Sequence, residues 1–494
     1  MQRRSGGFRA VLFGITAALT LSFCLTACGT GETTVEPTLD PNNPVTIDIW
    51  HYYNGPQKKA LDAMVAEFND TVGLEQGIIV EAFSQGKIAK LTEKVIDAAN
   101  KKVGADEIPS IFAAYPDTAY QVDQLGLVAD LSPYFTEEEL AEYVPGYIDE
   151  GRISGADSLK IFPMAKSTEI MMLNKTDWDK FAAETGASLD SLKTVEGLVK
   201  VAQQYYEWTD AQTETPDDGK AFFGRDAVAN YFVIGCKQLG TEIFDMSSGS
   251  IVFHTDREII RKLWDNYYTP SVNGWFGAYQ QFRADDAKTG KIIALIGSTS
   301  GATYFPTEVS VDDAEGYPIE SYAMEIPVFE GGEKVNVQQG AGLVVAKSDP
   351  KTEYASSIFL KWFTEEDRNI QFSISSGYLP VKISANDMEK INAAVEQNSE
   401  SAAVVKKLSA FLPVSIQTVK DFELYTSKAF NGGTEARNVL EYSLSNLVKK
   451  DLAEIQSLVD NGMTRSEAAA QYTTDEHFNE WYESFCQALE AAVS

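Results

Sequence analysis

One stretch near the start of the chain constrains the fold most, because it predicts a strand that turns directly into a helix. Apolar and polar residues alternate over residues 47–49, and four ring-bearing side chains follow at residues 50–53. A turn at Asn54-Gly55 leads to Pro56, a residue suited to the first turn of a helix. The predicted helix has an apolar face made of Leu61, Met64, Val65 and Phe68.

Open α/β sheets bind their ligands at the carboxyl ends of strands, which is where this aromatic cluster lies. We therefore expect Trp50, Tyr52 and Tyr53 to form one wall of a cleft. Side chains alternate across a strand, so about half of the cluster can face a ligand, and Tyr52 and Tyr53 are the preferred pair because they lie nearest the turn.

The strand–helix alternation continues beyond this unit. Residues 78–83 predict a strand, residues 87–102 an amphipathic helix and residues 108–115 a short buried strand that ends at Tyr115. Such an order predicts an α/β fold with parallel, doubly wound sheets. A chain of 494 residues exceeds what one core usually organises, so we expect two domains.

Composition excludes several function classes. The formal charge is −31, and it becomes −34 without the first 27 residues, which hold three arginines and no acid. Such a surface repels nucleic acid. No metalloprotease, dinucleotide, phosphate-loop or hydrolase-elbow motif occurs, so we expect no cofactor, no metal and no catalytic residues. Cys236 and Cys486 could form a disulfide, but two buried thiols are the favoured interpretation.

The first 27 residues have the pattern of a secretory signal peptide: arginines at positions 3, 4 and 9, then an uncharged run from Val11 to Ala27. The run ends in Leu25-Thr26-Ala27-Cys28, which resembles a bacterial lipobox. That resemblance implies a lipid on Cys28 and attachment to the outer face of the cytoplasmic membrane. Residues 28–45 are rich in Gly, Thr, Pro and acid, and predict a flexible tether.

Several segments in the body resemble one family in the family's own order. They are residues 50–53 with their helix, residues 109–115, residues 125–134, residues 161–175, which close on Asn174-Lys175, residues 337–346 and residues 377–381. Together they resemble the extracellular solute-binding proteins of ABC sugar importers, the maltose-binding-protein-like group.

The resemblance implies a two-lobed, type II periplasmic-binding-protein-like fold with a hinged cleft. Lobe 1 would comprise residues 46–163 and 327–373, and lobe 2 residues 164–326 and 374–494. It implies a non-enzymatic, monomeric protein that captures a sugar or oligosaccharide and delivers it to the permease subunits of an ABC transporter.

Loops with small or aromatic residues supply the other candidate contacts. Residues 297–304 follow an apolar strand and offer hydroxyls and N–H groups, and residues 273–279 carry Trp275 and Phe276 in a Gly-flanked loop, where presentation to a ligand is favoured over packing. Asp226 or Asn230 could face the cleft or serve as a helix cap. The predicted ligand-binding residues are Trp50, Tyr52, Tyr53, Tyr115, Lys166, Ser167, Thr168, Asp226, Trp275, Ser298, Ser300, Gly340 and Tyr378.

Three alternatives remain open from the sequence. The ligand could be a glycerol phosphate or phosphodiester, held by the small residues 297–301 and paired with Lys166. A surface glycoside hydrolase could use the same aromatics as subsites. A structural adhesin would bind no small molecule.

Overall fold

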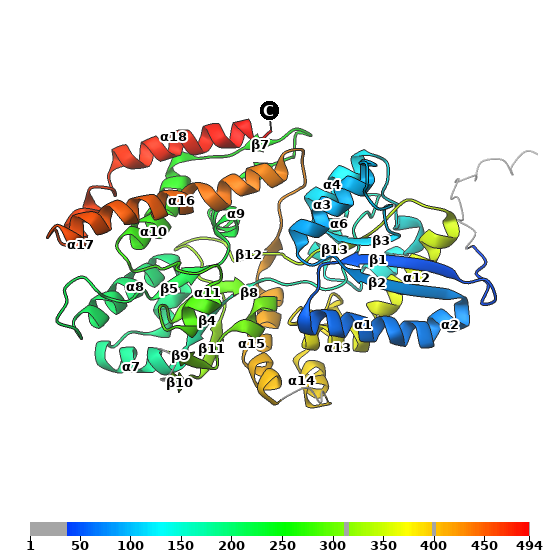
Figure 1. Cartoon of the computed structure of the whole chain (residues 1–494), viewed down its shortest axis with the longest axis horizontal. Helices are drawn as coiled ribbons and strands as arrows, with labels where there is room; N and C mark the ends of the chain where they lie inside the picture. The colour runs from blue at the N-terminus through cyan, green and yellow to red at the C-terminus, as the bar shows by residue number, and fades with distance from the viewer. Residues whose placement is uncertain (1–36, 311–315, 398–401, 494) are drawn as a thin grey trace, which may run out of the picture. The chain divides into compact units, whose positions relative to one another are not determined.

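The computed structural model describes residues 37–310, 316–397 and 402–493. Residues 38–494 form one compact unit, which contains two sheets with separate cores (Figure 1). Across the described ranges, no helix is long and apolar enough to cross a bilayer. The predicted signal peptide, Cys28 and most of the tether lie outside the described residues.

The first sheet has the order β13-β3-β1-β2. Strand β1 is parallel to β2 and β3, as predicted, whereas β13 is antiparallel to β3. Its strands are β1 (Val45–His51), β2 (Ile78–Ser84), β3 (Ile111–Ala114) and β13 (Gly342–Val345), and its main helices are α1 (Gly55–Asp70), α3 (Ile88–Ala99), α4 (Pro116–Gln124) and α12 (Pro350–Phe363). The predicted helix face of α1, including Leu61 and Phe68, is buried in this first core.

The second sheet has the order β11-β4-β8-β5 and is mixed rather than parallel. Strand β4 is antiparallel to both β11 and β8, and only β5 and β8 are parallel. The prediction of parallel sheets was therefore wrong for β13, β4 and β11. Each of these strands follows a connection other than a simple helical crossover within one sheet, and such a connection does not impose a parallel direction.

The strands of this second sheet are β4 (Glu169–Asn174), β5 (Phe223–Arg225), β8 (Ala294–Ser298) and β11 (Ser321–Met324). The helices that pack in the second core are α7 (Lys175–Thr185), α8 (Val195–Asp210), α9 (Val228–Gln238), α10 (Arg257–Val272), α16 (Gly433–Asp460), α17 (Arg465–Ala470) and α18 (Asp475–Ala491). Helix α16 ends at Asp460, directly before Asn461-Gly462, and Leu440 and Leu444 on its inner face are fully buried.

The remaining elements are short or connect the two sheets. They are α2 (Val72–Gln76), η1 (Ser132–Tyr134), α5 (Glu137–Leu140), α6 (Pro145–Gly151), η2 (Leu189–Lys193), β6 (Phe244–Asp245), β7 (Val252–Phe253), α11 (Arg283–Lys288), η3 (Thr299–Tyr304), β9 (Glu308–Ser310), β10 (Gly316–Pro318), β12 (Val335–Val337), α13 (Glu366–Ser376), η4 (Ile383–Ala385), α14 (Met388–Gln397), α15 (Ala402–Asp421) and β14 (Glu423–Tyr425).

Three segments that run between the sheets are hydrogen-bonded to one another. Ser167 N donates to Gln339 O at 2.9 Å and Gln339 N donates back to Ser167 O at 2.8 Å, while Lys166 N donates to Leu379 O at 3.2 Å. Gly340 permits this approach, because its φ is +94° and a Cβ there would lie 2.8 Å from Ala165 O. The three segments therefore meet in one small ladder, which we call the hinge ladder.

The two cores suggest where the lobes divide. Phe329, Val335 and Val337 pack in the second core, while Ala341 and Leu343 pack in the first. From this packing we propose that the chain returns to lobe 1 between Val337 and Ala341, later than the boundary at residue 327 that the sequence motifs suggest.

Candidate functional site

Of the three predicted aromatic residues at the turn after β1, one is partly exposed and two are buried. Strand β1 ends at His51, so Tyr52 and Tyr53 lie in the turn before α1. Tyr52 is half-buried, and its hydroxyl lies 3.0 Å from that of Tyr378. Trp50 and Tyr53 are 7% and 1% exposed and belong to the first core. Of the predicted cluster, Tyr52 is thus the residue that remains partly exposed.

Tyr115 stands beside this turn, at the carboxyl end of β3. Its side chain is 39% exposed, and the backbone N–H of Gly340 hydrogen-bonds to it. Burial raises the pKa of Tyr115, Tyr52 and Tyr378 above the usual value for tyrosine, so all three hydroxyls keep their protons at neutral pH and can both donate and accept.

The hydroxyls of Tyr52 and Tyr378 continue into the loop after β8. Ser300 hydrogen-bonds to Tyr378, and Ser298 Oγ lies 2.9 Å from Ser300 Oγ. A Cβ on Gly377 would lie 3.2 Å from Ser300 O, which shows how closely the two segments approach. The hydroxyl chain Tyr52–Tyr378–Ser300–Ser298 thus joins the first core to the second sheet, and we call it the tyrosine–serine chain.

Lys166, Ser167, Thr168 and Gly340 form the hinge ladder rather than an open surface. Lys166 is fully buried, pairs with the Glu150 carboxylate and donates to Gly340 O at 2.9 Å. Thr168 Oγ1 donates to Val337 O at 2.8 Å. The polar groups of Lys166 and Thr168 are therefore engaged within the protein, and a ligand contact from either would require the hinge ladder to rearrange.

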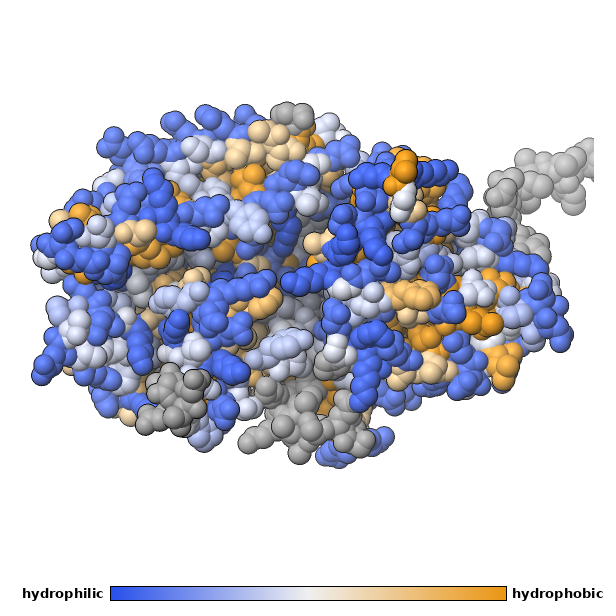
Figure 2. Space-filling model, in the orientation of Figure 1, coloured by the Kyte–Doolittle hydropathy of each residue, from blue (hydrophilic) through white to orange (hydrophobic). Residues whose placement is uncertain are grey.

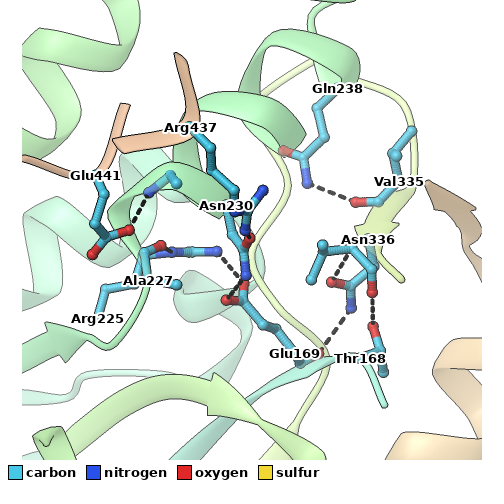
Figure 3. Close-up of polar contacts among 12 residues, drawn as sticks. Thr168, Glu169, Arg225, Ala227, Asn230, Gln238, Val335, Asn336, Arg437 and Glu441 are labelled. Atoms are coloured by element: carbon cyan, nitrogen blue, oxygen red, sulfur yellow. Dashed lines mark hydrogen bonds and ion pairs between the residues drawn. The ribbon is translucent and has the colours of Figure 1, made fainter. Parts of the chain in front are cut away.

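A buried polar network lies behind the lobe 2 side of the site (Figure 3). Glu169 on β4 pairs with Arg225 on β5 and accepts from Asn230 Nδ2 at 2.7 Å. Asn230 is fully buried, and its Oδ1 accepts from Arg437 on α16. The side chain of Asn230 is thus used within the interior. Of the two candidates Asp226 and Asn230, Asp226 is the one nearer the surface.

Asp226 lies just beyond the end of β5, and its side chain is 33% exposed. Its Oδ1 accepts from the backbone N–H of Arg283 at 2.9 Å, and an added Cβ on Gly297 would lie 2.7 Å from its Oδ2. Burial raises its pKa, and the hydrogen bond from Arg283 partly offsets that rise. The carboxylate therefore lies where β5 and β8 end, next to the loop that carries Ser298 and Ser300.

The loop at residues 273–279 differs from its prediction. Phe276 is 7% exposed and Trp275 is half-buried against the second core, so favouring presentation of the pair was wrong for Phe276. The ring of Phe276 packs edge-on against Phe223 at 4.8 Å between centroids. An aromatic side chain in a Gly-flanked loop can pack into the core instead of facing a ligand, and sequence alone does not distinguish these two arrangements.

Three exposed rings on the lobe 2 side were not singled out from the sequence. Tyr279 and Phe282, which flank the Arg283 that contacts Asp226, are 54% and 55% exposed, and Tyr304 at the end of η3 is 68% exposed. The signal for Tyr304 was its place directly after the small-residue loop 297–301. Figure 2 shows that the face in view is largely hydrophilic and is hollowed near its middle.

The described residues contain no cluster of three or more His, Cys, Asp or Glu side chains that could hold a metal ion. Cys236 and Cys486 are both free thiols, as the favoured interpretation predicts, but only Cys236 is buried and Cys486 is half-buried. Burial raises the pKa of Cys236 to about 12.

Solved structures with the same fold come from several bacteria. The cyclic α-maltosyl-1,6-maltose binding protein of Arthrobacter globiformis aligns with a TM-score of 0.64 and 17% identity, over 91% of this chain and 99% of its own. UgpB of Mycobacterium tuberculosis, solved with glycerophosphocholine, gives 0.63 and 15%, over 92% and 100%. Lmo0181 of Listeria monocytogenes, solved with cycloalternan, gives 0.62 and 15%, over 91% and 100%. These likenesses show the periplasmic-binding-protein-like fold.

No curated protein matches the sequence. A family model described as bacterial extracellular solute-binding protein matches residues 63–399, most of the body. Members of this family bind solutes and are not enzymes, which removes the glycoside hydrolase alternative. The chain therefore belongs to the bacterial extracellular solute-binding proteins, the solute-binding components of ABC transporters.

Proposed function

We propose that this protein captures a sugar or oligosaccharide outside the membrane, held there by a lipid on Cys28, and delivers it to an ABC permease. The observation that carries the ligand class is the tyrosine–serine chain with the exposed ring of Tyr115 beside it. Sugars present apolar ring faces and a rim of hydroxyls, and clefts of this kind combine aromatic faces with a few placed polar groups.

The site on the second sheet supplies complementary groups. Asp226 can accept from sugar hydroxyls, and the exposed rings of Tyr279, Phe282 and Tyr304 offer further stacking surfaces. Two of the structural relatives were named or solved with cyclic oligosaccharides, which supports the same class of ligand.

A phosphodiester is the second candidate, because UgpB was solved with glycerophosphocholine. The pairing of the basic side chains near the site argues against a phosphodiester ligand. Lys166, the cation expected to pair with a phosphate, is buried on Glu150, and the arginines nearest Asp226 are paired: Arg225 with Glu169 and Arg283 with Asp286. With these three cations engaged, a phosphate beside Asp226 would depend mainly on N–H groups and hydroxyls.

Titration calorimetry of the purified protein tests these two ligand classes together. The panel is maltose, maltotriose, a cyclic oligosaccharide and glycerophosphocholine, each with and without added inorganic phosphate. We expect saturable binding to at least one oligosaccharide, with an affinity that phosphate leaves unchanged. Binding of glycerophosphocholine alone, weakened by phosphate, would favour the second candidate, and the absence of all binding would contradict both.

A further inference from the structure

A cavity of about 190 Å³ lies beside the hinge ladder, and its lining includes none of the residues of the tyrosine–serine chain. One wall is formed by α6 and the start of α4. Tyr147 and Ile148 of α6 pack in the first core. The other wall is residues 424–429, between Phe422 and Phe430 of the second core. The cavity is therefore bounded by segments attached to both cores.

Gln338 forms the inner wall of this cavity and carries an acceptor without a partner. Its side chain is 3% exposed, and Nε2 donates to Gly146 O at 3.0 Å and to Glu150 Oε2 at 2.9 Å. The orientation of the amide is fixed, because a carboxylate can only accept and so must face the NH₂ group. Oε1 makes no hydrogen bond within the described residues.

The missing side chain of Gly146 leaves this acceptor uncovered. A Cβ there would lie 3.0 Å from Gln338 Oε1 and 3.5 Å from Leu424 O. A buried acceptor without a partner is costly, so the site favours an occupant that donates a hydrogen bond at this point.

The rest of the lining narrows the chemical class of that occupant. Its charged residues are two acids, Asp149 and Glu150, and two bases, Arg152 and Lys428, so the lining has no net formal charge. Thr426 and Ser427 add half-buried hydroxyls, for which the structure shows no hydrogen bond among the described residues. A neutral molecule rich in hydroxyls can donate to Gln338 and exchange hydrogen bonds with Thr426 and Ser427.

We propose that this cavity is a second ligand site, separate from the cleft, for a small neutral polyol or monosaccharide. By this volume the cavity has room for several water molecules, and so for a small molecule in their place. Because its walls belong to both cores, occupancy would be coupled to movement between the lobes, and the coupling would be reciprocal with ligand binding in the cleft. Only this coupling rests on the proposed function, since binding in the cavity does not require a carbohydrate in the cleft.

Calorimetry of the purified protein with glycerol, glucose and myo-inositol tests the site. The background variant is Tyr115→Ala, which weakens the cleft but lies outside the cavity lining. We expect saturable binding of at least one probe to persist in Tyr115→Ala and to weaken about tenfold or more when Gly146→Ala is added. The added methyl group takes the position from which a ligand would reach Gln338 Oε1.

A second variant guards against misfolding of Gly146→Ala, which changes a residue inside α6. Ser427→Ala removes a half-buried hydroxyl without adding atoms, and we expect a few-fold loss of probe affinity with an unchanged thermal midpoint. The proposal is overturned if no probe binds to wild type or to Tyr115→Ala. Probe binding that disappears in Tyr115→Ala, or that Gly146→Ala and Ser427→Ala both leave unchanged, would place the probes elsewhere and would also overturn it.

Discussion

His51 shows how a residue in the aromatic turn can affect folding without touching a ligand. It is fully buried, Nδ1 accepts from Tyr53 N at 3.1 Å, and Nε2 has no hydrogen-bond partner among the described residues. Burial, with a smaller effect of Lys58, lowers its pKa from 6.5 to about 4. The unfolded chain thus takes up a proton between pH 6.5 and 4 that the folded protein does not.

Stability should therefore fall as the pH falls through this window. We expect His51 to cost the wild type about 3 kcal/mol of unfolding free energy between pH 7 and pH 4, since each pKa unit corresponds to about 1.4 kcal/mol. His51→Asn, which keeps an acceptor for Tyr53 N, should lose that part of the pH dependence. Urea unfolding at several pH values measures it, and identical pH slopes for wild type and His51→Asn would contradict this account.

A substitution at Lys166 tests whether this residue has a structural role or makes the ligand contact that the sequence predicts. Removing one partner of a buried ion pair leaves the other charge unpaired, so Lys166→Met should destabilise the protein by about 3–5 kcal/mol. Adding Glu150→Gln should recover much of that loss, because the amide still accepts from Gln338. If Lys166→Met keeps wild-type stability but loses oligosaccharide binding, the ligand-contact prediction is right and the structural role is wrong.

At the residue scale, the sequence predicted a set of candidate side chains but could not orient them. Tyr52, Tyr115, Ser298, Ser300 and Tyr378 lie in or beside one hydroxyl chain, and whether they bind a ligand stays a prediction. Whether a given ring faces solvent or the core depends on helices contributed from far along the chain. Trp50 and Phe276 are both buried, and the sequence around each of them does not indicate that burial.

At the scale of elements, the first sheet and its helices were predictable because their apolar periods are local. The β1–α1 unit was confirmed. The direction of β13 in the first sheet and of β4 and β11 in the second was not predictable, since it depends on how the chain passes between sheets. The buried network of Glu169, Arg225, Asn230 and Arg437 was missed for the same reason: its members are up to 268 residues apart and meet only after folding.

The contact between α4 and α16 contains a half-buried acid, Asp117, whose titration should affect the stability of the protein. A Cβ on Gly433 at the start of α16 would lie 2.6 Å from Asp117 Oδ1 in the first turn of α4. Burial raises the pKa of Asp117 from 3.8 to about 6. Arg437 and the N–H of Phe430 oppose the rise, and Glu435 adds to it.

Because the folded pKa of Asp117 is raised, the folded protein holds a proton between pH 4 and 6 that the unfolded chain has lost. The contribution of Asp117 to stability therefore falls as the pH rises through this window, opposite in sign to that of His51. We expect Asp117→Asn to remove this falling component, so that its stability relative to wild type increases from pH 4 to pH 6. A difference in stability that does not change with pH would contradict the assignment.

At the scale of the whole molecule, the proposed lipid on Cys28 sets where the protein works. We expect the wild type to fractionate with membranes when it is expressed with its own leader, and Cys28→Ser to be found in the soluble extracytoplasmic fraction or with an uncleaved leader. Cys24→Ser is the matched control, and it should fractionate like wild type. Equal membrane association of wild type and Cys28→Ser after leader cleavage would contradict the anchor.

The central claim is that the tyrosine–serine chain and Tyr115 bind an oligosaccharide between two lobes. The most direct test is the affinity of Tyr115→Ala for the best oligosaccharide of the calorimetric panel, with Tyr442→Ala as control because Tyr442 is a 56% exposed ring on α16. Loss of one buried aromatic contact is worth about 1.5–3 kcal/mol, so affinity should fall at least about tenfold in Tyr115→Ala and stay unchanged in Tyr442→Ala. Equal affinities for wild type and Tyr115→Ala, with both proteins folded, would contradict the claim.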